Sequence, residues 1–118
     1  MAVIGFSSKP EYNWVVARWV YRQVLEDLIS HCPEDSEIAD TAANSLETDG
    51  LLMEFLEPSL AARITNAVRE VVAGILSGAI RSGIHDQSYG DAYRVGEYRK
   101  ALQELLQAIP SPEGQKSA

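Results

Sequence analysis

The chain has 118 residues, 46% of them hydrophobic, and a formal net charge of −7 at pH 7. That length suits one hydrophobic core and is too short for two independent ones. The negative charge repels phosphate backbones and anionic headgroups, which argues against nucleic acid or a membrane surface as the main partner.

Cysteine content and the start of the chain indicate the compartment. Cys32 is the only cysteine, which excludes an internal disulfide framework. The opening MAVIGFSSKP lacks the basic start and long apolar core of a signal peptide. The longest apolar run, at 71–80, holds about half the residues needed to span a bilayer. We therefore expect a cytoplasmic protein.

The first expected element is a helix over 10–31. Ser7 and Ser8 are suitable N-cap residues, and Pro10 suits a first helical turn. From Trp14 onward the apolar residues follow a helical spacing. They are Trp14, Ala17, Tyr21, Val24 and Leu28. Trp14 and Trp19 lie in this stripe or at its edge, so we interpret both as core aromatics.

Two shorter apolar segments follow. Pro33 should end the first helix and open a second over about 34–46, because proline and carboxylates are favoured in a first turn. Its apolar stripe, from Ile38 to Leu46, is narrow. A turn at 48–50 then leads to LLMEFLEP at 51–58, which we interpret as buried and as helical rather than extended.

The central helix is expected over 58–81. Its apolar residues recur at steps of three and four, and Pro58 and Ser59 favour its start. Gly74 and Gly78 each cost about 1 kcal/mol relative to alanine inside a helix, so they predict a second helix crossing closely there.

The C-terminal part is expected to hold one loop, one helix and a tail. Residues 82–93 are rich in turn formers and predict the longest loop. The last helix should run from 91 or 95 to 109 and end at Pro110. Residues 111–118 contain almost no apolar side chain and predict a disordered tail.

Together these elements predict an all-α fold. We expect a single domain over 1–110, built as a bundle of four to five helices with short connections.

Charge is distributed unevenly along this sequence. Residues 23–62 contain no lysine or arginine but ten carboxylates, so they contribute −10 while the flanks contribute +3. One interpretation is a solvated face that keeps the protein soluble. The other is a patch complementary to a strongly basic partner, such as a nucleic-acid enzyme whose substrate groove is lined with lysine and arginine.

Two other clusters contain residue types used in catalysis or metal binding. His31 and Cys32 lack the further Cys or His ligands that zinc needs, and the acids after them lack the spacing of a calcium loop. We expect no metal and no cofactor. The loop cluster of Ser82, His85, Asp86, Tyr89 and Asp91 could supply a nucleophile and a base, but partner contact and ordinary turn chemistry explain it better.

A single-domain acidic chain with a carboxylate-loaded helix and loop resembles the immunity proteins of bacterial contact-dependent growth inhibition and related polymorphic toxin systems. The resemblance implies a non-enzymatic protein that neutralises a cognate, nuclease-type toxin by covering its basic surface. It implies no cofactor. The expected partner-binding residues are Glu34, Asp35, Glu37, Asp40, Glu47, Asp49, Glu54 and Glu57, with His85, Asp86, Tyr89 and Asp91 as a second contact.

The alternative is a helical homodimeric structural or adaptor protein. Its interface would be the Gly74 and Gly78 face or LLMEFLEP, and its acidic segment would be solvated surface only.

Overall fold

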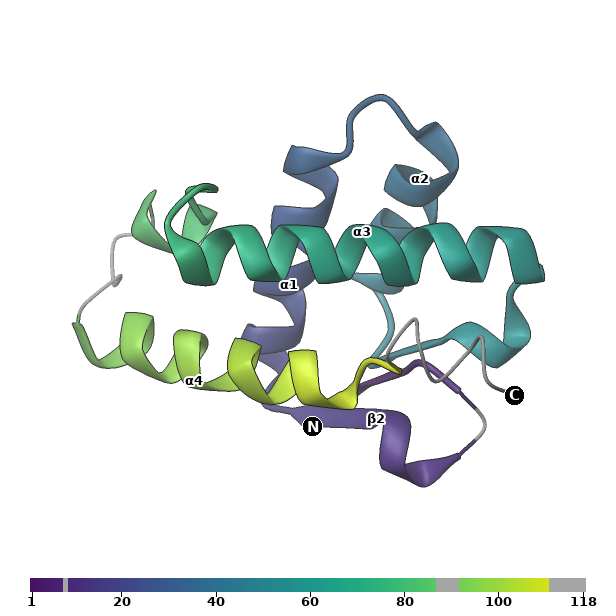
Figure 1. The fold of residues 1–118 in the computed structure, drawn as a ribbon, viewed down its shortest axis with the longest axis horizontal. Helices are drawn as coiled ribbons and strands as arrows, with labels where there is room; N and C mark the ends of the chain where they lie inside the picture. Colours follow the sequence, from purple (N-terminus) through teal and green to yellow (C-terminus); the bar gives the residue numbers. More distant parts are fainter. Residues whose placement is uncertain (8, 87–91, 111–118) are drawn as a thin grey trace.

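A computed structural model shows four helices and a three-stranded sheet, and it describes residues 1–7, 9–86 and 92–110 (Figure 1). The strands are β1 (Ala2–Gly5), β2 (Asn13–Val16) and β3 (Gly50–Leu52). The helices are α1 (Arg18–His31), α2 (Ser36–Ser45), α3 (Pro58–Ser77) and α4 (Ala92–Ala108). Three short 3-10 helices are η1 (Pro10–Tyr12), η2 (Met53–Phe55) and η3 (Gly83–Asp86).

The sheet is mixed, with strand order β2-β1-β3. β1 and β2 are antiparallel, with Ile4 opposite Trp14, and β1 and β3 are parallel, with Ile4 opposite Leu51. These three side chains are buried, whereas Val15 on the other face is 56% exposed. The helices therefore cover the face that carries these three side chains, and among the described residues the other face is partly exposed.

The helices pack on one another and on the sheet. α3 and α4 lie side by side in front of α1 and run in opposite directions (Figure 1). Trp14 links the layers, since its indole N–H donates to the carbonyl of Ala101 at 3.1 Å. Residues of every strand and every α-helix contribute to one hydrophobic core, as one domain requires.

The prediction of an all-α bundle is wrong, because the helix expected over 10–31 begins only at Arg18. Residues 13–16 form β2 instead, with Trp14 and Val16 buried and Asn13 and Val15 exposed. This alternation is the signature of a half-buried strand. Pro10 opens a 3-10 helix between β1 and β2 instead of the first turn of α1.

The segment LLMEFLEP is also partly extended. Gly50–Leu52 forms β3 and Met53–Phe55 a 3-10 helix, so its expected helical character holds only for the second half. A segment this short adopts the conformation that its partner dictates, and β3 has β1 as a partner 47 positions earlier, at Val3 opposite Gly50.

The remaining helices agree with expectation within a few residues, apart from the end of α3. α3 stops at Ser77 because Gly78 adopts a left-handed conformation, with φ 88°. A Cβ on Gly74 would lie 2.5 Å from the Ile80 side chain. The close neighbour of Gly74 is therefore the returning chain and not the expected second helix.

The expected disordered tail, 111–118, lies outside the described residues. Within the described part of the chain, no helix is both long enough and apolar enough to cross a membrane.

Candidate functional site

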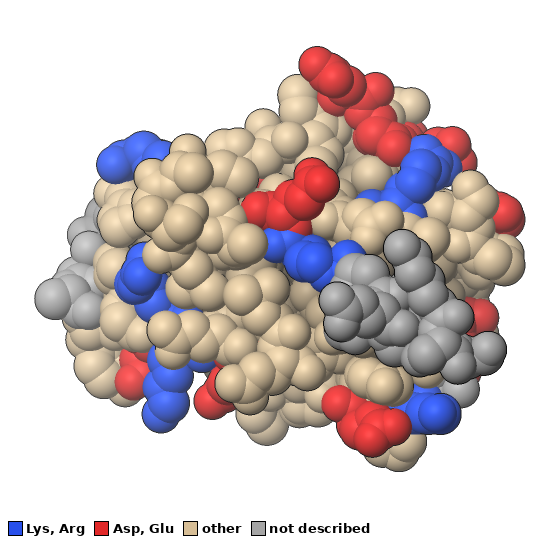
Figure 2. All heavy atoms as spheres, in the orientation of Figure 1, with Lys and Arg blue, Asp and Glu red and all other residues tan. Residues whose placement is uncertain are grey.

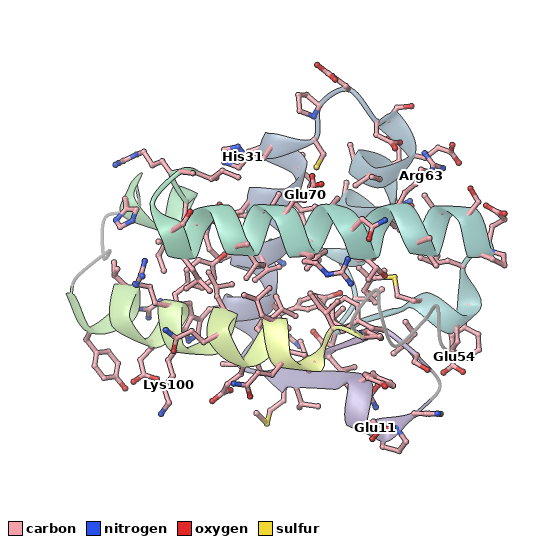
Figure 3. The ribbon with its side chains drawn as sticks, in the orientation of Figure 1. Glu11, His31, Glu54, Arg63, Glu70 and Lys100 are labelled. Carbon is pink, nitrogen blue, oxygen red and sulfur yellow. The ribbon has the colours of Figure 1, made fainter. Side chains whose placement is uncertain are left out.

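The acidic segment gathers around α2, β3 and η2. Figure 2 shows red carboxylates over this top and right-hand part of the molecule, and Figure 3 places Glu54 at the right. Eight expected partner-binding carboxylates lie in this region: Glu34, Asp35, Glu37, Asp40, Glu47, Asp49, Glu54 and Glu57. Their structural roles divide them into two groups.

The first group already has partners. Arg63 of α3 reaches Asp35 at 2.7 Å and Glu37 at 3.0 Å, and Arg18 of α1 reaches Asp49 at 2.7 Å. The flanks thus supply counter-ions that the segment itself lacks. These pairs are partly exposed, so each adds little to stability.

Two of the carboxylates also cap helices. Asp35 accepts from the backbone N–H of Ile38 at the start of α2. Glu57 accepts from the backbone N–H groups of Ser59 and Leu60 at the start of α3. A capping oxygen satisfies N–H groups that have no partner inside the helix, so these acids serve the fold.

The second group is free to meet an external cation. Glu34, Asp40, Glu47 and Glu54 are exposed, and the described residues make no hydrogen bond or ion pair with their side chains. Sequence reasoning treated all eight acids alike. The tertiary fold decides which of them lie close to an arginine from another part of the chain.

A hollow of about 450 Å³ lies between α2 and the β3–η2 segment. Its lining residues are Thr41, Asn44, Ser45, Thr48, Gly50, Leu51, Leu52, Phe55 and Leu56. Asp40, Glu47 and Glu54 are each adjacent in sequence to one of these residues, and Glu54 itself lines a different hollow, with Phe6 and Met53. Phe55 is 77% exposed at its edge.

An exposed phenylalanine beside a hollow is the arrangement of a binding anchor. Burying such a ring in a partner removes much apolar surface from water, and aromatic anchors dominate many interfaces. Sequence reasoning did not single out Phe55, because the apolar residues of LLMEFLEP were interpreted as buried.

The second expected contact lies elsewhere. His85 is on η3, after the C-terminal end of α3, whereas the acidic segment surrounds its N-terminal end. Twenty helical residues separate these ends by about 30 Å. Asp86 ends η3, and Tyr89 and Asp91 lie outside the described residues.

The surroundings of His85 are cationic. Arg81 and Arg99 line the same hollow of about 250 Å³ as His85, and Figure 3 places Lys100 toward this left-hand end. The two expected contact regions therefore do not form one face.

Sequence reasoning missed a buried polar cluster at Asp27. This carboxylate is 2% exposed and accepts from Ser82 Oγ at 2.5 Å, Tyr98 Oη at 2.7 Å and the Gly83 N–H at 2.9 Å. Gln23 Nε2 adds a fourth donor at 3.1 Å. The cluster joins α1, the η3 turn and α4. Buried polar groups whose hydrogen bonds are all satisfied commonly help to specify a unique packing.

The cluster has a structural role that explains Ser82. Its hydroxyl donates to Asp27 and accepts from the Ile84 N–H. Because its proton is directed to Asp27, this hydroxyl is not arranged as a nucleophile with His85 as its base. Burial raises the pKa of Tyr98, and the neighbouring Asp27 charge raises it further. Tyr98 therefore remains a neutral donor to the carboxylate.

His31 and Cys32 lie at the C-terminal end of α1. His31 Nε2 is 3.2 Å from the carbonyl of Arg81, and burial raises the pKa of the half-buried Cys32 thiol, with Asp35 and Glu70 adding to the shift. A thiol with a raised pKa is a poor nucleophile and metal ligand. Within residues 1–7, 9–86 and 92–110, no three His, Cys, Asp or Glu side chains are grouped to hold a metal.

No family model, curated protein or solved structure matches this chain.

Proposed function

We propose that the chain is a non-enzymatic immunity protein, which neutralises a basic, nuclease-type toxin by covering its substrate groove. The binding surface is the α2–β3 face, defined by Asp40, Glu47, Glu54, Phe55 and the hollow between α2 and β3. Glu34 extends its negative charge beyond α2.

The single observation that carries this proposal is the exposed Phe55 ring at a hollow whose lining residues adjoin, in sequence, three exposed carboxylates that have no partner among the described residues. Acidic surface alone is explained by solubility, and an apolar ring alone is common on protein surfaces. An apolar anchor with a rim of one charge sign fits a partner surface of the opposite sign.

The carboxylates and the Phe55 ring are expected to affect different rates of binding. The rim carboxylates accelerate encounter with a basic surface, and salt screens this effect. The Phe55 ring becomes buried in the complex and slows dissociation, since central aromatic anchors cost about 2 kcal/mol or more when truncated.

Co-expression with the product of the neighbouring gene, the candidate toxin, tests the proposal. We expect the wild-type chain to restore growth of cells that produce this toxin domain. A triple variant with Asp40→Asn, Glu47→Gln and Glu54→Gln should protect poorly, because the rim loses three negative charges.

A matched variant controls for net charge. Glu70, Glu97 and Glu104 are exposed carboxylates on α3 and α4, and none lines the hollow. Changing all three to glutamine removes the same charge and should leave protection intact. Equal loss in both triple variants, or no protection by the wild type, contradicts the proposal.

The homodimer remains the competing proposal, with a reduced structural basis. Ile80 covers Gly74, so a second helix cannot pack directly on that glycine, and Gly78 lies beyond the end of α3. Phe55 could still form a self-interface. Sedimentation at increasing protein concentration separates the two, since the immunity proposal expects a constant monomer mass.

A further inference from the structure

β3 lies at an edge of the described sheet, since it pairs with β1 on one side only. Such an edge presents backbone groups that can pair with another strand. Only three residues form β3, which keeps the exposed edge short.

The direction of the β3 backbone groups follows from its pairing. The Val3 N–H donates to the carbonyl of Asp49 at 2.9 Å, so the polar groups of alternate residues, Asp49 and Leu51, face β1. The N–H groups of Gly50 and Leu52 therefore point away from β1. The Gly50 carbonyl confirms this direction, because it accepts from Thr48 Oγ1 at 3.0 Å.

The hollow of the α2–β3 face follows this edge. All three β3 residues line it, and Thr41, Asn44 and Ser45 of α2 form its opposite wall. A trough between an edge strand and a helix accommodates an extended peptide, whose main chain pairs with the strand while its side chains contact the walls.

We propose that an extended segment of the basic partner pairs with the outer edge of β3 and occupies this trough. The inference rests on the proposed function and specifies the part of the toxin that is bound. Carbonyl groups of the segment accept from the Gly50 and Leu52 N–H groups.

Charge and apolar surface determine the chemistry of that segment. Lysine or arginine side chains meet Asp40, Glu47 and Glu54, and an apolar side chain packs against Phe55 and Leu56. The segment therefore carries both basic and apolar side chains.

Amide hydrogen exchange of the immunity chain with and without the toxin domain tests the inference residue by residue. We expect exchange at Gly50 and Leu52 to slow at least about tenfold in the complex, since each N–H gains an acceptor. Leu51 is the internal control, because its N–H faces β1 in the free protein.

A backbone variant provides a second readout. An ester at position 52 removes the Leu52 N–H and keeps the side chain. Because it also weakens the Leu51 carbonyl as an acceptor for β1, the free energy of unfolding of the ester variant is measured beside its affinity. We expect the affinity for the toxin domain to fall about tenfold, as for the loss of one hydrogen bond in a buried setting.

The outcomes distinguish the two proposals. If the toxin domain binds and protects cells but exchange at Gly50 and Leu52 is unchanged, strand pairing is wrong and the proposed function stands. If the toxin domain does not bind at all, both are wrong. Slowed exchange at both residues together with weaker binding of the ester supports strand pairing.

Discussion

Asp27 is a carboxylate that the fold uses internally. Although it belongs to the acidic segment of the sequence, it is buried and accepts from four donors, two of them from Ser82 and Tyr98. Its neighbour Glu26 is exposed. The two adjacent acids therefore provide a matched pair for mutation.

We expect Asp27→Asn to lower the free energy of unfolding by about 2 kcal/mol or more. The substitution replaces a charged acceptor by an amide whose N–H₂ faces other donors, which leaves buried groups unpaired. Glu26→Gln should change it by less than about 0.5 kcal/mol. Urea denaturation at pH 7 measures both, and equal effects would mean that the cluster is not structural.

Tyr98 gives a prediction at alkaline pH. Because its pKa is raised in the folded protein by burial and by Asp27, folding keeps it neutral above pH 10, where unfolded tyrosine ionises. Its contribution to stability is present below that pH and is lost as pH rises further. Tyr21, whose pKa burial also raises, contributes in the same direction.

We expect Tyr98→Phe to be less stable than the wild type at pH 7 by about 2 kcal/mol, because Asp27 loses a donor. Above pH 10 the free energy of unfolding of the variant should fall less steeply with pH than that of the wild type. The two slopes should differ by up to about 1.4 kcal/mol per pH unit. Urea denaturation between pH 7 and 11 tests this, and parallel curves would exclude the raised pKa.

Residue roles were the least predictable part of the sequence. Asp27 and Glu26 look alike in a charge count, and only the return of the chain at Ser82 and Tyr98 distinguishes them. Phe55 was likewise hidden in an apolar segment, because exposure depends on which side of η2 faces the core. No local pattern encodes either property.

At the scale of elements, the end of α3 depends on a contact between Gly74 and Ile80. The Ile80 N–H donates to the Gly74 carbonyl at 3.0 Å, which lays the isoleucine over the glycine. A Cβ at position 74 would clash with Cδ1 and Cγ1 of that side chain. Gly74 is therefore needed because the chain turns back over it at Ile80, and not because another helix packs on it.

We expect Gly74→Ala to be destabilising in the wild type, by about 1 kcal/mol or more, because Ile80 must move. In an Ile80→Ala background the same change should be nearly neutral or stabilising, since alanine has the higher helix propensity. A thermal-unfolding double-mutant cycle measures the coupling. Additive effects would contradict the contact.

Element prediction succeeded where the signal is local. α2, α3 and α4 have helical periodicity within their own sequence, and α2 and α3 also have capping residues there, so the ranges were predicted to within a few residues apart from the end of α3. The strands have four residues or fewer and form only because distant segments meet, which a local pattern cannot show. Trp14 and Ala17 fit the helical spacing of Tyr21, and that continuity favoured extending the helix back over β2.

At the scale of the whole molecule, charge is unevenly distributed. Exposed carboxylates gather around α2, β3 and η2, whereas Arg81 and Arg99 line the hollow after α3, and Figure 3 places Lys100 toward that left-hand end. A concentration of carboxylates on one part of the surface attracts a basic protein before contact. The acidic segment was identifiable from sequence, but its division into capping, paired and free carboxylates was not.

We expect the association rate with the basic toxin domain to fall at least about tenfold between low and physiological salt, because ions screen the rim carboxylates. Dissociation should change less, since Phe55 is buried in the complex. Stopped-flow mixing at several salt concentrations measures both rates. An association rate independent of salt would show that the carboxylates do not accelerate binding of the toxin domain.

The most direct measurement is the affinity of the toxin domain for Phe55→Ala beside Tyr93→Ala, by titration calorimetry. Both aromatics are exposed, at 77% and 74%, but only Phe55 lies on the α2–β3 face, whereas Tyr93 is in the first turn of α4. We expect Phe55→Ala to weaken binding by about thirtyfold, as for an anchor worth about 2 kcal/mol, and Tyr93→Ala to leave it unchanged. Weakening by Tyr93→Ala alone would place the interface at the other end of the molecule and contradict the proposed function of the α2–β3 face.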